Sequence, residues 1–515
     1  MKSLAEKLNL EVNPYVFFIS IAVILAFVFT GAIMPERTGE VFDIVQEFIV
    51  LNFGWFYILS MAFFVIFVIG VGISKFGNIK LGPDDSEPEY SYFSWFAMLF
   101  SAGMGIGLIF YGVAEPIWNY IWPPRAEEAS QAAYDDAMLY TFFHWGLQPW
   151  AMYITVGMAL AYYHFRRGLP LSIRSAFYPI LGDRIYGGIG NTIDIFAIFG
   201  TMFGVATSLG IGATQVGAGL SYIFGVENTV TLWIILIAII TAFATVSVFL
   251  GLDKGIRRLS NFNLSAAALL VVFVFIAGPT LYLLNSLMVN TGEYFQNVIG
   301  LTFWMDTESR EWQGAWTLFY WGWWIAWSPF VGMFIARVSK GRTIREFVFG
   351  VLFVPIAFTF IWLTFFGNTA LMYEIEGIAD ISSLEDPEML FGLLEAMPFS
   401  LLSSILATVL IVTFFVTSSD SGSLVIDMLA SGGNPNPPRG QRVFWALSEG
   451  AVAAVLLLAG GHEALQTASI TTGLPFALII IILCYSLVVA LRKEGIEKSK
   501  STKRFSAKRP SDREE

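Results

Sequence analysis

The chain has very little of the side-chain chemistry that soluble enzymes use. Its 515 residues include one cysteine, Cys484, which excludes a disulfide framework and any multi-cysteine metal site. The three histidines, His144, His164 and His462, lie far apart and show no metal-ligand spacing. The formal net charge of −11 argues against nucleic acid as a partner. No Ser/His/Asp or Cys/His set has workable spacing, so an enzyme is the least favoured class.

Charged residues are also scarce, at 13% of the chain, whereas hydrophobic residues make up 56%. A soluble protein of this length cannot bury so much apolar surface, so the composition predicts a polytopic membrane protein. Twelve apolar runs are long enough to cross a bilayer, and they predict an all-α fold with twelve transmembrane helices. The runs lie at 15–34, 51–74, 92–113, 139–163, 193–222, 230–250, 261–285, 314–336, 346–367, 399–424, 442–460 and 471–491.

Basic residues are almost missing from one side of these predicted spans. With the N-terminus in the cytoplasm, only Arg37, Arg125 and Arg310 of the 29 Lys and Arg residues fall in outer loops. The positive-inside rule then places both termini in the cytoplasm, and we expect a multi-pass protein of a prokaryotic inner (plasma) membrane. Three parts are expected: an N-terminal tail at 1–14, a twelve-helix domain at 15–491 and a basic tail at 492–515. The basic tail is expected near anionic lipid headgroups.

Four acidic residues fall within or beside the predicted spans. Glu115 and Asp420 lie in mid-span, where an unpaired carboxylate would cost roughly 2.5–3.5 kcal/mol. Both are therefore expected to face the interior of the helix bundle, in hydrogen bonds that brace helices rather than in proton coupling. Asp194 and Glu449 lie nearer the span ends and are expected to be solvated.

Tryptophan is concentrated in one stretch, 312–340, which holds six of the chain's 16 tryptophans. Positions 314–336 carry no charge and are long enough to span a bilayer. Four aromatic residues of the stretch follow helical spacing and share one helix face: Trp316, Tyr320, Trp323 and Trp327. A face of indole rings suits a cation that has no hydrogen-bond donor, because the ring quadrupole attracts positive charge.

The third run contains three alternating glycines, Gly103, Gly105 and Gly107. Each weakens a helix by about 1 kcal/mol relative to alanine, which allows an unwound segment whose carbonyls line a cavity and can coordinate a cation. Close helix packing by small residues is an equally good interpretation of the glycines alone. The tryptophan-rich eighth run follows five spans later, which allows two inverted five-helix repeats, in spans 3–7 and 8–12.

Two segments resemble a known family. The residues G-M-G-I-G-L-I-F-Y-G-V-A-E-P at 103–116 and Y-W-G-W-W-I-A-W-S-P-F-V-G-M-F-I-A-R-V-S-K-G-R-T-I-R-E-F at 320–347 closely resemble the betaine/choline/carnitine transporter family. The resemblance extends over 15–491. It implies a LeuT-like secondary transporter of twelve spans with two inverted five-helix repeats, often assembled as a homotrimer. Such transporters move compatible solutes that carry a quaternary ammonium group, usually together with sodium.

The resemblance also implies a substrate site. It places an aromatic box for the ammonium group on the fourth and eighth spans, beside the glycine stretch. The implied substrate-binding residues are Trp145, Trp150, Tyr153, Trp323, Trp324, Trp327, Met104 and Gly105. Each ring that faces a desolvated trimethylammonium group can contribute up to about 2 kcal/mol.

A sodium site is implied in the same way, between the third and tenth spans. Its implied ligands are the carbonyls of Ser101, Met104 and Phe414, together with Thr417 and Ser418. Oxygen ligands suit a hard cation, but such hydroxyls also bond to their own helix, which is the better interpretation without the resemblance. Thr201 matches a second sodium site of the family. Val205 stands where sodium-coupled members can carry threonine, so the number of coupled sodium ions, one or two, remains open.

The resulting hypothesis is a sodium-coupled symporter that takes up glycine betaine, or a related solute such as ectoine, proline betaine or dimethylsulfoniopropionate, for osmoprotection. Choline-preferring relatives often carry aspartate at Gly107, and glycine there favours a zwitterion over a net cation. Sodium-independent exchangers of the family carry an arginine in the seventh span, whereas residues 260–264 contain no cation. A choline/carnitine-type carrier, a sodium-independent exchanger, and a channel or osmosensor are the alternatives. No cofactor is expected besides the coupling ion Na+.

Overall fold

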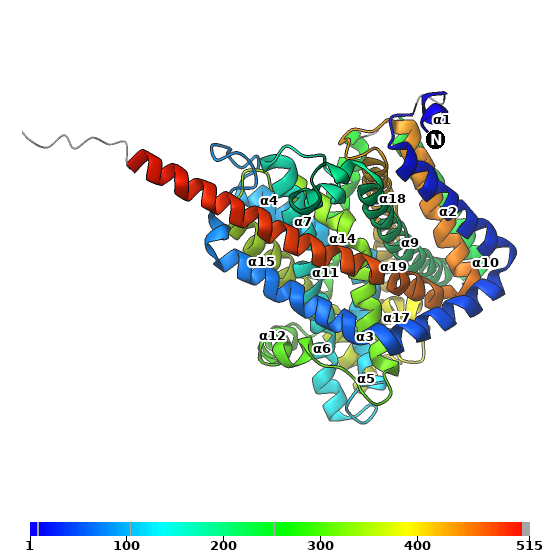
Figure 1. The fold of residues 1–515 in the computed structure, drawn as a ribbon. Coiled ribbons are helices and arrows are strands. Elements are labelled where there is room, and N and C mark those ends of the chain that lie inside the picture. The colour runs from blue at the N-terminus through cyan, green and yellow to red at the C-terminus, as the bar shows by residue number, and fades with distance from the viewer. Residues whose placement is uncertain (8–9, 104, 251–252, 507–515) are drawn as a thin grey trace, which may run out of the picture.

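The computed structural model describes residues 1–7, 10–103, 105–250 and 253–506 (Figure 1). Within those residues every regular element is a helix, apart from one isolated antiparallel bridge between Lys80 and Thr343. The prediction of an all-α protein is therefore confirmed for this part of the chain. Long helices cross one another to form the body of the molecule, and α3 and α19 lie side by side along one flank.

The helices have the following bounds. The first half comprises α1 (Lys2–Lys7), α2 (Pro14–Ile33), α3 (Pro35–Ile73), η1 (Lys75–Asn78), α4 (Tyr92–Gly103), α5 (Ile106–Ile121), α6 (Gln131–Trp145), α7 (Leu147–Ala161), η2 (Tyr162–Arg166), η3 (Ile173–Phe177), α8 (Tyr178–Leu181), η4 (Gly182–Tyr186), α9 (Gly188–Phe224) and α10 (Val230–Leu250). The second half comprises α11 (Asp253–Ala277), α12 (Thr280–Thr302), α13 (Glu311–Gln313), η5 (Gly314–Leu318), α14 (Phe319–Arg337), α15 (Ile344–Leu363), η6 (Thr364–Asn368), α16 (Thr369–Ile375), η7 (Asp386–Glu388), α17 (Met389–Glu395), α18 (Ser400–Ala430) and α19 (Arg439–Ser506).

Local sequence explains where several of these helices begin. The side chain of Asn13 accepts hydrogen bonds from the backbone N–H groups of Tyr15 and Val16 and so caps α2. Thr343 and Glu346 form a reciprocal capping box at the start of α15. These side chains satisfy N–H groups that have no partner inside the helix, and they fix where each apolar segment starts.

Eight helices in the described residues are long and apolar enough to cross a membrane by length and composition. The predicted runs at 92–113 and 139–163 are each built from two shorter helices, α4 with α5 and α6 with α7. The runs at 442–460 and 471–491 both lie in α19, whose backbone leaves helical geometry at Gly460 and Gly461. The twelve spans and the two inverted repeats stay a prediction.

The break between α6 and α7 has a clear packing cause. Gly146 has φ −90° and ψ −123°, and a Cβ atom there would lie 2.4 Å from the Tyr294 hydroxyl oxygen and 2.7 Å from the Phe142 carbonyl oxygen. The N–H of Leu147, which the break frees, donates to that hydroxyl at 2.8 Å. Tyr294 on α12 thus stabilises the interruption by replacing a lost helical hydrogen bond.

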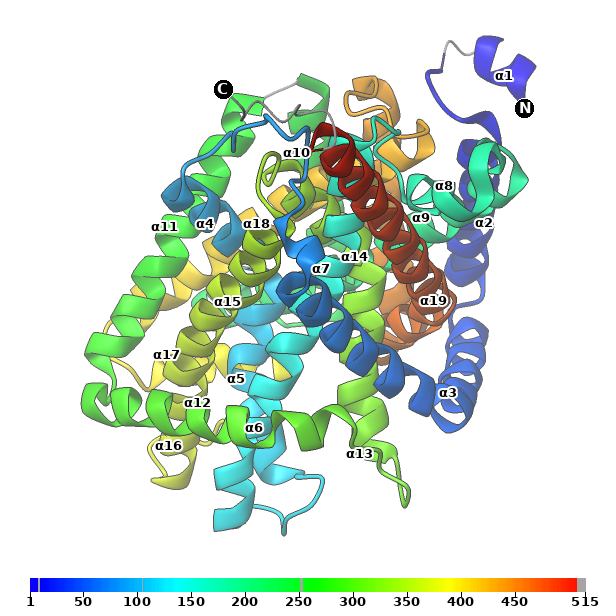
Figure 2. The same cartoon turned by 60° about the vertical axis from the view of Figure 1, so that its left-hand side comes forward.

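Helix α12 shows that the predicted seventh span, 261–285, ended at the wrong place. Helix α11 ends at Ala277, and α12 begins at Thr280 after Pro279 and lies across one end of the bundle (Figure 2). The apolar composition continues through this corner, so hydropathy alone did not reveal it. Proline favours such a boundary because it cannot continue the preceding helix.

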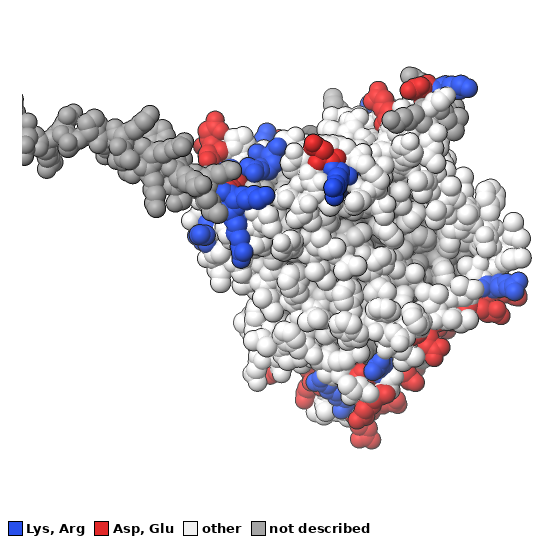
Figure 3. Space-filling view, viewed as in Figure 1, with Lys and Arg blue, Asp and Glu red and all other residues white. Residues whose placement is uncertain are grey.

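Charged side chains are gathered at the two ends of the bundle, with a broad uncharged band between them (Figure 3). Glu115 and Asp420 are buried, as predicted. The expectation that Asp194 and Glu449 are solvated is wrong, because both are fully buried. Asp194 forms an ion pair with Arg174, and Glu449 accepts a hydrogen bond from Ser419 Oγ at 3.0 Å. Such partners offset the desolvation of a buried carboxylate, and they come from other elements of the chain.

Candidate functional site

Six aromatic side chains, five of them buried and one half-buried, form one group where α6 ends, α7 begins and α14 crosses them. We call it the aromatic cluster; its members are Trp145, Trp150, Tyr153, Trp323, Trp324 and Trp327. The ring centroids of Trp145 and Trp324 are 4.9 Å apart, and those of Tyr153 and Trp324 are 6.4 Å apart, both in edge-to-face geometry. Trp150 contacts Tyr153 at 5.5 Å. The structure thus brings together Trp145 and Trp324, which are about 180 positions apart in the sequence.

Three of the five indole N–H groups of the cluster, those of Trp145, Trp323 and Trp324, are bonded to the protein. Trp324 Nε1 donates to the His144 carbonyl oxygen at 3.0 Å. Trp323 Nε1 donates to the Gly204 carbonyl oxygen at 3.2 Å. Indole has a single donor and no acceptor, so these bonds satisfy each ring completely and fix its orientation. What these indole rings can still offer a ligand is the π face, whereas the Tyr153 hydroxyl is buried and has no hydrogen-bond partner among the described residues.

Glu115 on α5 holds a third indole and joins three helices. Its carboxylate is fully buried and accepts hydrogen bonds from Trp145 Nε1 at 2.8 Å, Tyr320 Oη at 2.5 Å and His144 Nδ1 at 2.6 Å. His144 Nε2 lies 3.0 Å from Thr317 Oγ1. A buried carboxylate is tolerated only when donors surround it, and here the donors come from α6 and α14. Glu115 therefore orients Trp145 and braces the wall of the cluster.

The glycine stretch passes directly against these rings. A Cβ atom at Gly107 would lie 2.5 Å from Trp323 Cη2 and 3.2 Å from Trp145 Cη2, so any side chain there would displace the cluster. Gly105 caps α5 in extended conformation, and its Cβ position is 3.8 Å from Trp327 Cη2, an ordinary contact. Met104, which was predicted for both the substrate and the sodium site, lies outside the described residues.

Two small cavities of about 20 Å³ each lie within the cluster. One is lined by Trp145, Pro149, Trp150, Tyr153, Trp324, Trp327 and Thr359. The other is lined by Gly105, Ile106, Gly107, Leu108, Trp145, Ser208, Trp323, Trp324, Trp327 and Ser418. Each can hold about one water molecule. A solute with several methyl groups would therefore enter only if the rings move apart.

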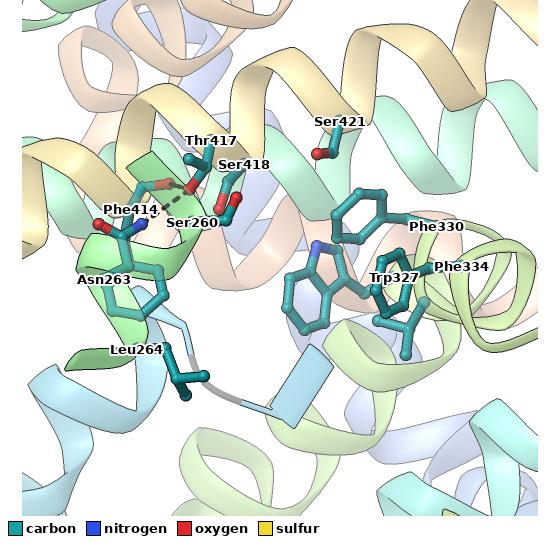
Figure 4. A pocket seen from close by; sticks show the side chains of 11 residues that line it. Ser260, Asn263, Leu264, Trp327, Phe330, Phe334, Phe414, Thr417, Ser418 and Ser421 are labelled. Atoms are coloured by element: carbon teal, nitrogen blue, oxygen red, sulfur yellow. Dashed lines mark hydrogen bonds between the residues drawn. The ribbon is translucent and has the colours of Figure 1, made fainter. Parts of the chain in front are cut away.

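A larger cavity of about 110 Å³ adjoins the cluster between α11, α14 and α18 (Figure 4). Its lining residues are Ser260, Asn263, Leu264, Trp327, Phe330, Val331, Phe334, Phe414, Thr417, Ser418 and Ser421. Trp327 and Ser418 line both this cavity and the small cavity beside the glycine stretch. These two residues therefore separate the cluster from the larger space.

Three of the predicted sodium ligands, Phe414, Thr417 and Ser418, line the larger cavity. Thr417 Oγ1 lies 3.1 Å from the carbonyl oxygens of Thr413 and Phe414 in its own helix. Thr201 is fully buried and its hydroxyl donates to the Ala197 carbonyl oxygen at 2.8 Å, away from these cavities. Ser101 belongs to α4, but its side chain lies outside the described residues. The sodium site thus stays a prediction.

Asn263 on α11 is a residue of this cavity that was not predicted. Its Nδ2 donates to Thr417 Oγ1 at 3.2 Å, while its Oδ1 is buried and has no hydrogen-bond partner among the described residues. A buried carbonyl oxygen without a donor costs free energy unless a cation or water binds it. The sequence did offer one signal for this residue, because an asparagine inside an apolar helix needs a polar partner.

We expect Glu115→Ala to destabilise the protein, because it leaves the donors of Trp145, Tyr320 and His144 unpaired in a buried site. The loss should be roughly 3–5 kcal/mol of unfolding free energy, measured as a lower thermal midpoint in detergent. Glu385→Ala, in an exposed loop, is the matched control and should leave the midpoint unchanged. Equal midpoints for Glu115→Ala and the unmodified chain would show that this network does not hold the helices.

Comparison of the amino-acid sequence with known proteins identifies the family of this chain. The model of the betaine/carnitine/choline family of transporters matches residues 15–496. A glycine betaine transporter of Acinetobacter baylyi is 47% identical over 96% of this chain and 76% of its own length. A glycine betaine transporter of Bacillus subtilis is 47% identical over 95% of this chain and 96% of its own. The high-affinity choline transport protein of Escherichia coli is 42% identical over 97% of this chain and 75% of its own.

Among solved structures, a manganese transporter of Eremococcus coleocola is 11% identical and covers 84% of this chain and 92% of its own, with a TM-score of 0.40. A similarity of that size does not establish a shared fold. The family match and the 47% identity extend over nearly the whole chain. The chain therefore belongs to the betaine/carnitine/choline family of transporters.

Proposed function

We propose that this protein is a sodium-coupled symporter that takes up glycine betaine or a related compatible solute for osmoprotection. The observation that carries the proposal is the aromatic cluster, in which the N–H groups of Trp145, Trp323 and Trp324 are bonded to the protein. A quaternary ammonium group donates no hydrogen bond, so it is best held by ring faces whose own donors are satisfied. The names of the Acinetobacter and Bacillus relatives support the same solute.

In the proposed cycle, the solute enters the cluster as its rings separate and leaves through the larger cavity after Trp327 moves. Each ring facing the ammonium group would contribute up to about 2 kcal/mol. The cluster offers no free carboxylate to a net cation, because Glu115 already accepts three hydrogen bonds and Gly107 has no side chain. This neutrality favours a zwitterion, whose carboxylate balances its own ammonium charge.

The proposed sodium ion would bind between the glycine stretch and α18. Phe414, Thr417 and Ser418 are the proposed ligands on α18, with Ser101 and Met104 on the opposite segment. The unpaired Asn263 Oδ1 would add an oxygen from α11. An ion bound between two moving segments changes their equilibrium by its differential affinity for the two states, which is how it would couple to the solute. A second ion near Thr201 stays an open prediction.

The second candidate is a choline/carnitine-type carrier or a sodium-independent exchanger with the same site. It is favoured by the 42% identity to a choline transport protein. We further propose a homotrimer in a prokaryotic inner membrane with both termini in the cytoplasm, where most Lys and Arg residues of the loops would lie.

The direct test of this function is uptake of labelled glycine betaine into proteoliposomes. With a tenfold inward sodium gradient, accumulation should exceed that in a potassium gradient of equal size by up to about tenfold, because one coupled ion can sustain a solute ratio equal to its own gradient. Undiminished uptake without sodium would instead identify the exchanger. Counterflow of labelled betaine separates a carrier from a channel, since a channel shows none.

Removing a ring from the cluster should weaken binding of the solute. We expect Trp324→Ala and Trp150→Ala each to lower the affinity for glycine betaine at least about tenfold, as loss of one strong cation–π contact would. The measurement is the concentration dependence of uptake, together with quenching of tryptophan fluorescence. Trp55→Ala on the exposed face of α3 is the matched control. Unchanged affinity in both cluster variants would refute the assignment.

Thr417→Ala should raise the sodium concentration needed for half-maximal transport, because it removes a proposed ligand. We expect this sodium concentration to rise roughly tenfold, because the variant loses about one hydrogen-bond-like contact to a charged group. Thr413→Ala is the control, because its hydroxyl lies one turn earlier on α18 and bonds to the carbonyl oxygens of Val409 and Leu410. If both variants keep the sodium dependence of the unmodified chain, the α18 assignment is wrong.

A further inference from the structure

A separate cavity of about 350 Å³ lies at the end of the bundle where α19 passes α8, and it shares no lining residue with the aromatic cluster. Its lining residues are Tyr163, Arg167, Leu169, Tyr178, Pro179, Ala490 and Lys493. They come from η2, the loop that follows it, α8 and the late part of α19. None of them belongs to the solute or sodium sites proposed above.

The two cations of this cavity have no acidic partner among the described side chains. Arg167 and Lys493 are exposed, and neither side chain forms an ion pair or hydrogen bond within the described residues. Glu494, which directly follows Lys493, pairs with Arg166 instead, as does Asp84. Among the described side chains, none therefore forms an ion pair with Arg167 or Lys493.

An apolar stripe on α19 leads to these charges. Leu478, Ile482 and Tyr485 are 53%, 39% and 64% exposed, and their spacing of four and three residues places them on one helix face. Lys493 lies on the same face about two turns further on. Tyr178 at the cavity rim is also exposed. The apolar side chains are followed by a tyrosine and then by the cations. A phospholipid presents matching groups in the same order: its acyl chain, its glycerol and its phosphate.

The cavity also lies at the end of the bundle that holds most basic residues. Arg337, Lys340 and the last part of α19 belong to this end, and Figure 3 shows Lys and Arg gathered near the place where α19 leaves the body. By the positive-inside rule it is the predicted cytoplasmic face, where anionic lipids attract basic residues.

We propose that this cavity binds the phosphate headgroup of an anionic phospholipid, with an acyl chain along Leu478, Ile482 and Tyr485. The Arg167 guanidinium can bind two phosphate oxygens at once, and Lys493 adds a second positive charge. A soluble phosphate would use the cations but not the apolar stripe. The bound lipid joins α19 to the segment between α7 and α9, whatever solute the transporter carries.

The test measures phosphatidylglycerol bound to the purified full chain by native mass spectrometry. The double variant Arg167→Gln/Lys493→Gln should lower the affinity for phosphatidylglycerol roughly thirtyfold, since each cation near an anionic headgroup is worth about a fivefold change. Its weak binding of phosphatidylcholine should not change. Arg337→Gln/Arg439→Gln removes the same charge from two exposed positions at other helix ends and should retain binding. Arg167→Lys, which keeps the charge, should stay within about threefold.

Three results would overturn the proposal. The first is an equal loss of affinity in the Arg337/Arg439 control, which would mean unspecific attraction to the basic end. The second is competition by glycerol phosphate at the same concentration as the lipid, which would identify a soluble-anion site. The third is unchanged phosphatidylglycerol binding in an Arg167/Lys493 variant whose thermal midpoint shows that it is folded.

Discussion

The structure of the site depends on one constraint: a polar group far from water must find its partner within the protein. Glu115 shows the constraint most clearly, because its buried carboxylate accepts donors from Trp145, Tyr320 and His144. Those bonds determine which way the indole of Trp145 turns, and hence which ring face lines the cluster. Glu115 therefore sets the orientation of Trp145 in the wall of the cluster, although Glu115 itself does not line the cavities.

The same constraint explains how the broken helices are tolerated. A gap in a helix frees backbone groups, and water cannot satisfy them at this depth. At Gly146 the hydroxyl of Tyr294 takes the place of the lost carbonyl, and the carbonyl of Gly204 on α9 receives the indole N–H of Trp323. Backbone and side chain thus satisfy each other across helices, which leaves the indole faces and the unpartnered Tyr153 hydroxyl as the surface for a ligand.

The larger cavity beside the cluster has a different character. Serine, threonine and asparagine oxygens from α11 and α18 lie on one side of it, and Trp327 and Phe330 lie on the other (Figure 4). Oxygen ligands suit a hard cation and rings suit an organic one. The larger cavity and the small cavity beside the glycine stretch share Trp327 and Ser418. A movement of either side chain therefore changes the shape of both cavities.

Much of this arrangement was available from the sequence, because it depends on local periodicity. The low charge and the apolar runs predict a helical membrane protein, and the spacing of Trp323 and Trp327 places them on one face of α14. The glycines at 105 and 107 mark the interrupted segment. Side-chain type and helical repeat are properties of a single segment, so one sequence is enough to determine them.

Only the tertiary structure decided which segments meet. Nothing local distinguishes Asp194, which pairs with Arg174, from a solvated acid, and nothing in 260–264 indicates that Asn263 faces Thr417. The break at Gly146 likewise depends on a partner, Tyr294, almost 150 residues away. Polar groups buried in an apolar bundle are satisfied by whichever helix packs beside them, and that choice is made by the packing of the whole chain.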